Sequence, residues 1–177
     1  MLPMTTPEHT EHTEHTDRTP LLAEAVSLRA AGRTEEARTR LLALGERFPG
    51  DAEIAYQTAW AHDRLGLEAE AVPFYVSALA GTLTPEDRKG ALLGLGSTYR
   101  TLGRYEEAVR TLRTGAQEFP EHGAMRTFLA MALFNVGEAH DGMRLLLRLL
   151  TETSGDASVQ EYREAIDYYA KDLTVTE

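Results

Sequence analysis

Apolar residues recur at three- and four-residue intervals from Leu21 onward, and polar residues fill most positions between them. This periodicity is typical of amphipathic α-helices, because residues three and four apart share one helix face. Glycines interrupt the pattern at intervals of 34, 37 and 34 residues, at Gly32, Gly66, Gly103 and Gly137. Self-similarity at such a period indicates stacked repeats. The pattern therefore predicts an all-α chain built from helical hairpins.

A second small residue follows the repeated glycine by five positions. In three units it is alanine and in the fourth it is glycine: Ala37, Ala71, Ala108 and Gly142. We expect the first glycine to turn the chain after one helix, because glycine tolerates a positive φ angle. The second small residue then lets the two helices of a hairpin approach each other closely.

Proline and capping residues mark several helix ends. Two phenylalanine–proline steps, at 48–49 and 119–120, should end the second helix of units one and three, since proline cannot continue a helix. Thr84 followed by Pro85 is typical of an N-cap and a first helical turn.

These signals divide the chain into repeats at about 18–51, 52–88, 89–122 and 123–156, followed by a C-terminal helix at about 157–173. That last helix should cover the end of the array with an apolar stripe formed by Val159, Tyr162, Ile166, Tyr169 and Leu173. We expect residues 1–17 and 174–177 to be disordered.

The stretch "LGSTYRTLGRYEEAVRTLRTGAQEFPEH" resembles a tetratricopeptide repeat. The residues at that repeat's signature places are Leu95, Gly96, Tyr99, Gly103, Ala108 and Pro120. The region from about Gly81 to Leu173 is similar to a bacterial subgroup, tetratricopeptide repeat group five. The resemblance implies a right-handed α-solenoid of four hairpins plus a C-terminal capping helix, acting as a scaffold without a reaction of its own.

The composition narrows the function. A formal charge of −10 argues against nucleic acid as a ligand, because a phosphate backbone is held by a basic surface. There is no cysteine for thiolate chemistry or disulfides. The N-terminus does not have the pattern of a secretory signal, and the longest apolar runs are far shorter than a membrane span. We expect a soluble cytoplasmic protein, and the arginine- and alanine-rich composition indicates a bacterial source.

Three consecutive Glu-His-Thr triplets occupy residues 8–16. In an extended chain, histidines three apart are separated by roughly 9 Å, whereas zinc needs its nitrogens about 2 Å away. We therefore expect a solvated tail with at most weak, adventitious metal binding, and no dedicated metal site.

Catalytic and cofactor-binding motifs are not recognisable. The glycine-rich stretch "GALLGLGSTYR" lacks the lysine of a phosphate loop and follows no strand, so Gly96 is interpreted as a packing position. His62 takes the place that Tyr99 holds in the third unit, which favours a packing role. No serine, histidine and acid recur at a convincing spacing. We expect no cofactor and no enzyme activity.

The first helices of such repeats line the concave side of the array, where a partner binds. The residues that we place in this groove are Tyr56, Trp60, Arg64, Ser97, Arg100, Thr127, Met131, Phe134 and Asn135. Trp60 is the leading candidate, because tryptophan, tyrosine and arginine dominate binding energy at interfaces. The alternative for Trp60 is packing against the neighbouring repeat.

Chaperone-tail receptors of this repeat class grip a C-terminal carboxylate with lysines, asparagines and an arginine. Here the corresponding places hold Leu22, Val26, Gln57, Gly90 and Gly94, so the resemblance does not extend to that clamp. The predicted function is non-catalytic binding of a peptide or partner protein in the groove. The alternatives are a homodimer formed through the groove or an open end and, third, an enzyme or small-molecule carrier, which would need a closed pocket.

Overall fold

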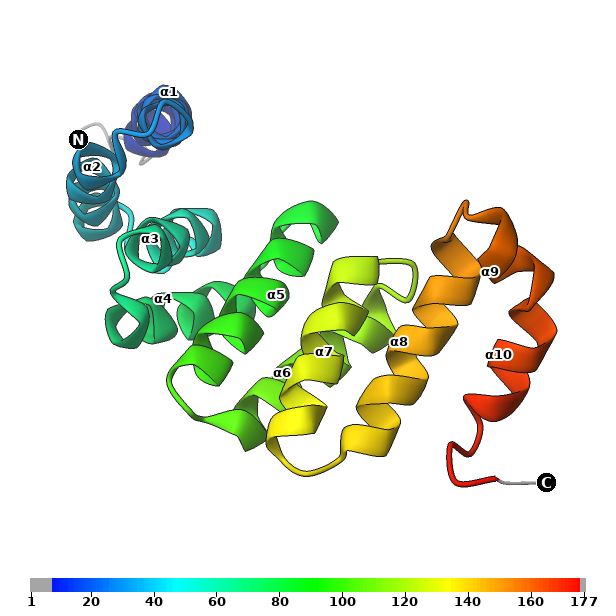
Figure 1. The fold of residues 1–177 in the computed structure, drawn as a ribbon. Coiled ribbons are helices and arrows are strands. Elements are labelled where there is room, and N and C mark those ends of the chain that lie inside the picture. The colour runs from blue at the N-terminus through cyan, green and yellow to red at the C-terminus, as the bar shows by residue number, and fades with distance from the viewer. Residues whose placement is uncertain (1–7, 176–177) are drawn as a thin grey trace, which may run out of the picture. The chain divides into compact units, whose positions relative to one another are not determined.

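The computed structural model describes the backbone of residues 8–175 and the side chains of residues 17–175. Within those ranges all regular structure is helical (Figure 1). The helices are α1 (Glu8–Ala30), α2 (Thr34–Arg47), α3 (Ala52–Arg64), α4 (Glu68–Ala80), α5 (Pro85–Thr101), α6 (Tyr105–Glu118), α7 (Gly123–Asn135), α8 (Ala139–Thr153), α9 (Ala157–Glu161) and α10 (Arg163–Tyr169). The all-α class predicted from the periodicity is confirmed.

The chain forms two compact units that meet within α5, the first ending at Asp87 and the second beginning at Arg88. Unit 1 contains α1 to α4, and unit 2 contains most of α5 and the helices that follow it.

In unit 1, consecutive helices pack as hairpins. α1 lies beside α2, α2 also contacts α3, and α3 packs along α4 (Figure 1). The core that joins the first three helices consists of Leu22, Ala25, Leu28, Ala37, Leu41, Leu44, Ile54 and Ala61. Each leucine buried there contributes roughly 1.5–3 kcal/mol, which explains why the apolar stripe defines the hairpin.

The four periodic glycines end the first helix of each hairpin in the left-handed conformation. Their φ angles are 78°, 72°, 73° and 86° for Gly32, Gly66, Gly103 and Gly137. In every case the next N–H donates to the carbonyl oxygen five residues earlier, the bond of a Schellman helix end. The four bonds are Arg33 to Leu28 at 2.9 Å, Leu67 to His62 at 3.0 Å, Arg104 to Tyr99 at 2.8 Å and Glu138 to Leu133 at 2.9 Å. The turning role predicted for these glycines is confirmed.

The second set of small residues lies where the helices of a hairpin touch. Ala37, Ala71 and Ala108 are fully buried. A Cβ atom at Gly142 of α8 would lie 2.8 Å from the carbonyl oxygen of Ala130 on α7. Close helix approach, as predicted, therefore depends on these small side chains.

The predicted helix ends are also observed. α2 and α6 stop immediately before the phenylalanine of each phenylalanine–proline step. α5 begins at Pro85, and the Thr84 hydroxyl accepts the N–H of Asp87 at 3.1 Å, so Thr84 caps the helix.

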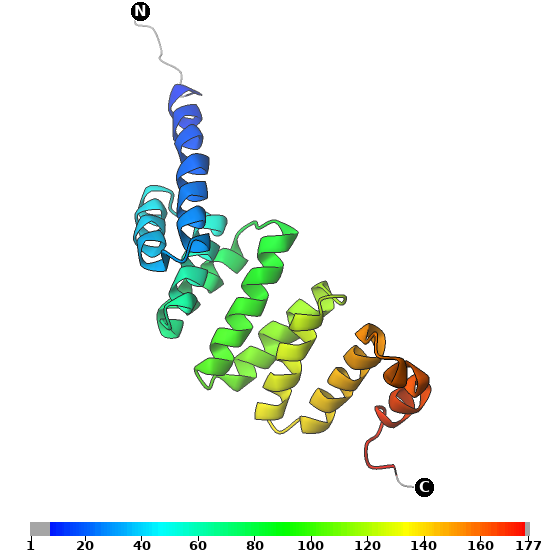
Figure 2. The same cartoon turned by 45° about the horizontal axis from the view of Figure 1, so that its top comes forward.

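In unit 2, α6 packs on α7 and α7 packs on α8 (Figure 2). The start of α5 is joined to the end of α6 by an ion pair, with Nε of Arg88 2.6 Å from Oε2 of Glu118. Gly96 of α5 faces Leu112 of α6, because a Cβ atom built at this glycine would overlap the leucine side chain. This contact agrees with the packing role predicted for Gly96.

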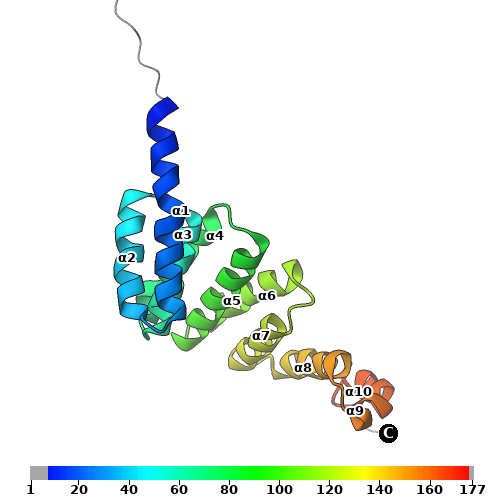
Figure 3. The ribbon, with the colours of Figure 1, turned by 90° about the horizontal axis from the view of Figure 1, so that it is seen from above.

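The C-terminal segment differs from the single helix expected at about 157–173. Two short helices, α9 and α10, meet at Tyr162, and α8 packs against both (Figure 3). Gln160 donates to the carbonyl oxygen of Thr151 at 3.1 Å, and the Thr151 hydroxyl donates to Asp167 at 2.7 Å. These polar contacts hold both short helices on the end of α8, and an apolar periodicity does not reveal them.

The apolar stripe expected on this segment is not buried as a unit. Tyr162, Tyr169 and Leu173 are exposed, whereas Ala170 is fully buried. The break at Tyr162 rotates the second helix, so a stripe drawn for one continuous helix gives the wrong buried face.

The N-terminal helix begins earlier than expected. The backbone of α1 is helical from Glu8, and its first turns extend past α2 (Figure 3), where the sequence predicted a disordered tail through residue 17. Extending an existing helix gains a backbone hydrogen bond for every residue fixed, which favours continuation from the packed part of α1. The disorder of the tail in solution stays a prediction, and residues 1–7 and 176–177 lie outside the described residues.

Candidate functional site

Trp60 of α3 lies in a cluster of stacked and hydrogen-bonded side chains in unit 1. The guanidinium carbon of Arg29 from α1 is 3.3 Å from the centroid of its ring. Arg29 also donates to the side-chain oxygen of Gln57, and the Tyr56 ring stacks on Trp60 with 6.2 Å between centroids. Trp60 is still 39% exposed. It therefore packs against the preceding hairpin, which is one of the two alternatives considered for it, and keeps an accessible surface; its role in binding stays a prediction.

Tyr56, which stacks on Trp60, is buried and does not face solvent. Its side chain is buried, and its ring lies 6.5 Å from that of Tyr75 on α4. The Tyr75 hydroxyl donates to Asp63 at 2.7 Å. Burial, and then the negative charge of Asp63, raise the pKa of Tyr75 far above its usual value, so this phenol stays a hydrogen-bond donor. Tyr56 is thus buried in the free chain, and its role as a direct contact stays a prediction.

The guanidinium groups of this region are not neutralised. Burial lowers the pKa of Arg29, and the positive charge of Arg64 acts in the same direction. Arg64 is exposed at the end of α3. Within residues 17–175, neither arginine forms an ion pair with a carboxylate. The region around Trp60 therefore contains two guanidinium groups that form no ion pair with a described carboxylate, although the charges of Asp87 and Glu86 also act on the neighbouring Tyr56.

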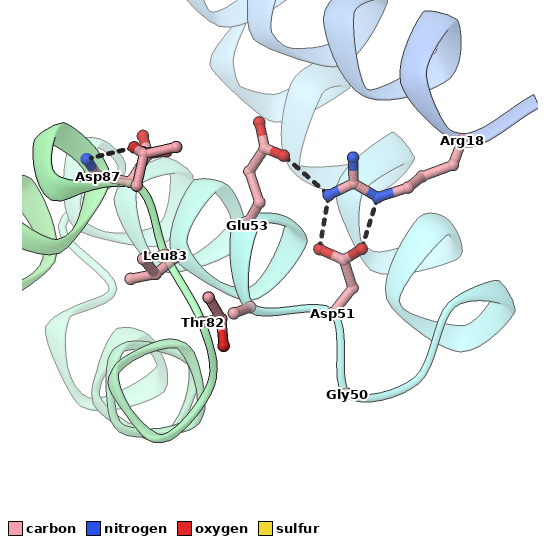
Figure 4. Close-up of a pocket in the computed structure, with 9 residues that line it drawn as sticks. Arg18, Gly50, Asp51, Glu53, Thr82, Leu83 and Asp87 are labelled. Atoms are coloured by element: carbon pink, nitrogen blue, oxygen red, sulfur yellow. Dashed lines mark hydrogen bonds and ion pairs between the residues drawn. The ribbon is translucent and has the colours of Figure 1, made fainter. Parts of the chain in front are cut away.

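A second feature of unit 1 is a cavity of about 300 Å³ beside Arg18 (Figure 4). Arg18 binds Asp51 through two hydrogen bonds of 2.5 and 2.9 Å, and Glu53 through one of 2.8 Å. The hydrogen bond to Asp51, followed by that to Glu53, holds the pKa of Arg18 above its usual value despite partial burial. Asp51 also caps α3 by accepting the N–H of Ile54 at 3.0 Å. The acids here are already paired, so this cluster joins α1 to α3.

Unit 2 contains an apolar cavity of about 390 Å³. Its lining comes from the end of α5, from α7 and from α8, and consists of Arg100, Ala130, Met131, Phe134, Asn135, Ala139, Gly142, Met143 and Leu146. Phe134 is 69% exposed and Met143 is 48% exposed, which is high for side chains of their size. A concave apolar surface with exposed anchors of this kind is typical of binding sites.

Two polar atoms at this cavity are buried without a hydrogen-bond partner in the chain. They are Nε of Arg100, a donor, and the side-chain oxygen of Asn135, an acceptor. A buried polar atom left unpaired costs about 1–3 kcal/mol. Because both atoms are inaccessible in the free chain, a ligand with a matching acceptor or donor recovers that free energy only if the side chain rotates to meet it.

The residues predicted from the sequence fall into two sets. Tyr56, Trp60 and Arg64 belong to the cluster in unit 1, whereas Arg100, Met131, Phe134 and Asn135 lie together at the cavity in unit 2. That the two sets form one groove stays a prediction.

Ser97 and Thr127 do not line the cavity, and the Thr127 hydroxyl donates within its own helix to the carbonyl oxygen of Gly123 at 2.9 Å. Sequence reasoning missed the α8 wall, formed by Met143 and Leu146, because it assigned only first helices to the inner face. Met143 and Leu146 lie three residues apart and therefore share one face of α8, which is the signal in the sequence that could have identified this wall.

Among the described side chains, no group of three or more histidine, cysteine or acidic residues could hold a metal ion. The histidines of the N-terminal triplets lie outside those side chains. His62 is buried, stacks on Phe74 at 5.0 Å and bonds the carbonyl oxygen of Thr58 at 2.8 Å, in agreement with its predicted packing role. Over the described residues, every helix is too short or too polar to cross a bilayer.

Comparisons with known proteins agree on the fold. A tetratricopeptide repeat model, that of group five, matches residues 52–173, and a second tetratricopeptide repeat model, that of group six, matches residues 21–51. A search of the curated proteins found no match.

Several solved structures are similar. The crystal structure of MamA protein is 14% identical, with coverage of 94% of this chain and 82% of that chain and a TM-score of 0.68. The crystal structure of YrrB, described as a TPR protein with an unusual peptide-binding site, is 19% identical, with coverage of 93% and 81% and a TM-score of 0.70. PilF of Pseudomonas aeruginosa is 19% identical, with coverage of 91% and 76% and a TM-score of 0.67. At these identities the structures support the fold alone.

Proposed function

Because the chain belongs to the tetratricopeptide repeat family, whose fold generally mediates protein–protein interactions, we propose that it is a non-catalytic scaffold that holds a peptide segment of a partner protein. The observation that carries the proposal is the apolar cavity of unit 2, with its exposed Phe134 and its two unpaired polar atoms. The peptide-binding site named in the description of YrrB supports the same class of ligand.

The cavity has apolar side chains that can contribute to the affinity for a peptide and polar atoms that can orient its main chain. Fully burying a phenylalanine or methionine side chain contributes about 1.5–3 kcal/mol, and much of Phe134 and Met143 is available for burial by a ligand. The buried donor of Arg100 and acceptor of Asn135 match the C=O and N–H groups of a bound main chain. An apolar side chain of the partner would fill the cavity, while its backbone would pair with these two atoms after the Arg100 and Asn135 side chains rotate toward it.

The chemistry of the lining favours binding over catalysis. It contains no carboxylate, imidazole or hydroxyl group, the side chains that usually transfer protons or attack a substrate. The proposal accordingly includes no cofactor and no metal. It keeps the expectation of a cytoplasmic protein, and the arginine- and alanine-rich composition favours a bacterial source.

The test is capture of partners on immobilised full-length protein, followed by reconstitution with a purified captured partner. Phe134→Ala and Met143→Ala should each weaken binding of that partner about tenfold, since 1.4 kcal/mol corresponds to one factor of ten. Leu150→Ala is the matched control, because Leu150 is an exposed apolar residue of α8 outside the cavity. Undiminished binding by both cavity variants would exclude the proposed site.

Self-association is the second candidate. Three exposed tyrosines at the C-terminal end favour it, namely Tyr162, Tyr168 and Tyr169. In this case the mass measured by sedimentation equilibrium should rise with concentration, and Tyr168→Ser should abolish that rise. A constant monomer mass would eliminate this candidate.

A further inference from the structure

Arg29 and Arg64 differ from most arginines of the described part of the chain, which bind carboxylates. Arg18, Arg88 and Arg126, for example, each bind an acidic side chain within unit 1 or within unit 2. Arg29 and Arg64 bind none. Arg29 stacks on the exposed ring of Trp60, and Arg64 follows Trp60 by four residues on α3, close enough for its charge to act on Arg29.

Arg29 is held in place by neutral groups. It is half-buried, with the Trp60 ring against its guanidinium plane and the Gln57 amide accepting one of its five N–H groups. A buried charge without a counter-ion is unfavourable, and the remaining N–H groups of this fork suit two carboxylate oxygens. Because stacking already fixes the guanidinium, little side-chain freedom would be lost on binding.

We propose that Arg29 and Arg64 bind a carboxylate side chain of an acidic segment of a partner protein, while Trp60 packs against an adjacent apolar side chain of the same segment. The inference rests on the proposed function and names its ligand class, an acidic peptide with apolar residues among its acids. Charge complementarity at the Trp60 surface identifies this occupant.

The net negative charge of the whole chain does not attract an acidic ligand, so its recognition depends on short-range contacts. At −10, the protein repels acidic molecules at long range, so an acidic segment is selected only through direct contact with the two guanidinium groups. The same field disfavours a nucleic acid strand, the other ligand that arginine and tryptophan side chains bind together.

Trp60 provides its own probe, since it is the only tryptophan of the chain. The experiment titrates the full-length protein with two blocked peptides, one alternating leucine with glutamate and the other alternating leucine with glutamine, and follows tryptophan emission. We expect the glutamate peptide to shift the emission and to bind at least about tenfold more tightly, because bonds between charged groups are stronger than neutral ones.

Two arginine variants identify the contact. Arg64→Gln should reduce the affinity for the glutamate peptide to that for the glutamine peptide, and the exposed position of Arg64 makes misfolding of this variant a small concern. Arg110→Gln is the matched control, because Arg110 is also exposed and forms no ion pair within residues 17–175. It should leave both affinities unchanged.

Equal binding of the two peptides, no binding of the glutamate peptide, or an unchanged preference in Arg64→Gln would overturn the inference. A stronger response to single-stranded thymidine oligonucleotide than to the glutamate peptide would do the same. These outcomes leave the proposed function intact as long as Phe134→Ala or Met143→Ala weakens partner binding. If neither Phe134→Ala nor Met143→Ala weakens partner binding, the proposed site fails whatever the peptides do.

Discussion

Replacing Gly103 with alanine tests the turn on which the repeat architecture depends. Gly103 has a φ angle of 73°, and the turn is closed by the Arg104 N–H bonded to the carbonyl oxygen of Tyr99 at 2.8 Å. A Cβ atom added at Gly103 would meet no atom within 4 Å. The substitution therefore changes the backbone preference without causing a steric clash.

The magnitude follows from two opposing effects. An L-residue in the left-handed conformation costs about 1–2 kcal/mol. Alanine also lowers the conformational entropy of the unfolded chain, which stabilises the folded protein by roughly 0.4–1 kcal/mol. We expect Gly103→Ala to be less stable by about 1 kcal/mol, equivalent to a decrease in Tm of about 2–4 °C for a chain of this length.

The matched control is Gly45→Ala, the same change inside helix α2. The nearest atom to the added Cβ is Cγ2 of Ile54 at 4.0 Å, an ordinary contact. Alanine is favoured over glycine in a helix by about 0.8–1 kcal/mol, so this variant should be more stable than the wild type. One chemical substitution is thus expected to have opposite signs at two positions.

Thermal and urea unfolding followed by far-ultraviolet circular dichroism measures both variants. Midpoints should be compared at equal protein concentration, because repeat arrays do not always unfold in one cooperative step. A midpoint for Gly103→Ala equal to or above that of the wild type would refute the reasoning. A lower midpoint for Gly45→Ala would refute the control argument in the same way.

Three further predictions concern the rest of the chain. Partial burial raises the pKa of Asp51, but hydrogen bonds from Arg18 and the backbone outweigh this effect and hold the pKa below its unfolded value of 3.8. Their stabilisation is complete above that value and lost as the pH falls through the folded pKa, so Asp51→Asn should flatten the acid limb of a plot of urea midpoint against pH. Tyr75→Phe removes the hydrogen bond to Asp63 and should lower the free energy of unfolding by about 1.5–3 kcal/mol, measured by urea unfolding, whereas an unchanged midpoint would contradict the role of that bond. Deletion of residues 1–17 should change neither the unfolding midpoint nor partner affinity by calorimetry, and a large loss of either would show that the triplets are part of the functional fold.

The fold could be predicted because its determinants are local in sequence. Gly32 and Ala37 lie five positions apart and together specify one turn and one close helix contact, and the same pair recurs in later units. A periodic signal of this kind repeats the same physical requirement in each hairpin. The repeat is therefore still recognisable in the second unit, although the interval there is longer than in the other units.

The C-terminal helices could not be predicted in the same way. Their position on α8 depends on Gln160 and Asp167, polar residues that an apolar pattern assigns to solvent. The bend at Tyr162 then places Ala170 at the buried contact, where the stripe had placed larger residues. Polar contacts between elements distant in sequence leave no periodic trace.

The candidate site was predictable in part for a similar reason. Trp60 and Phe134 could be named because residue type and place in the repeat both favour exposure at a binding surface. The stacking of Arg29 on Trp60 joins two hairpins, and the α8 wall of the unit 2 cavity belongs to a second helix. Both depend on how helices pack, which the sequence specifies only after the fold is known.

Hydroxyl-radical footprinting of the full-length protein with and without a reconstituted partner tests the account most directly, because tryptophan, methionine and aromatic side chains react readily when exposed. The account predicts slower oxidation of Trp60, Phe134 and Met143 in the complex, with Tyr162 and Tyr168 unchanged. Protection of the two tyrosines, with Trp60 and Phe134 as reactive as in the free protein, would contradict it.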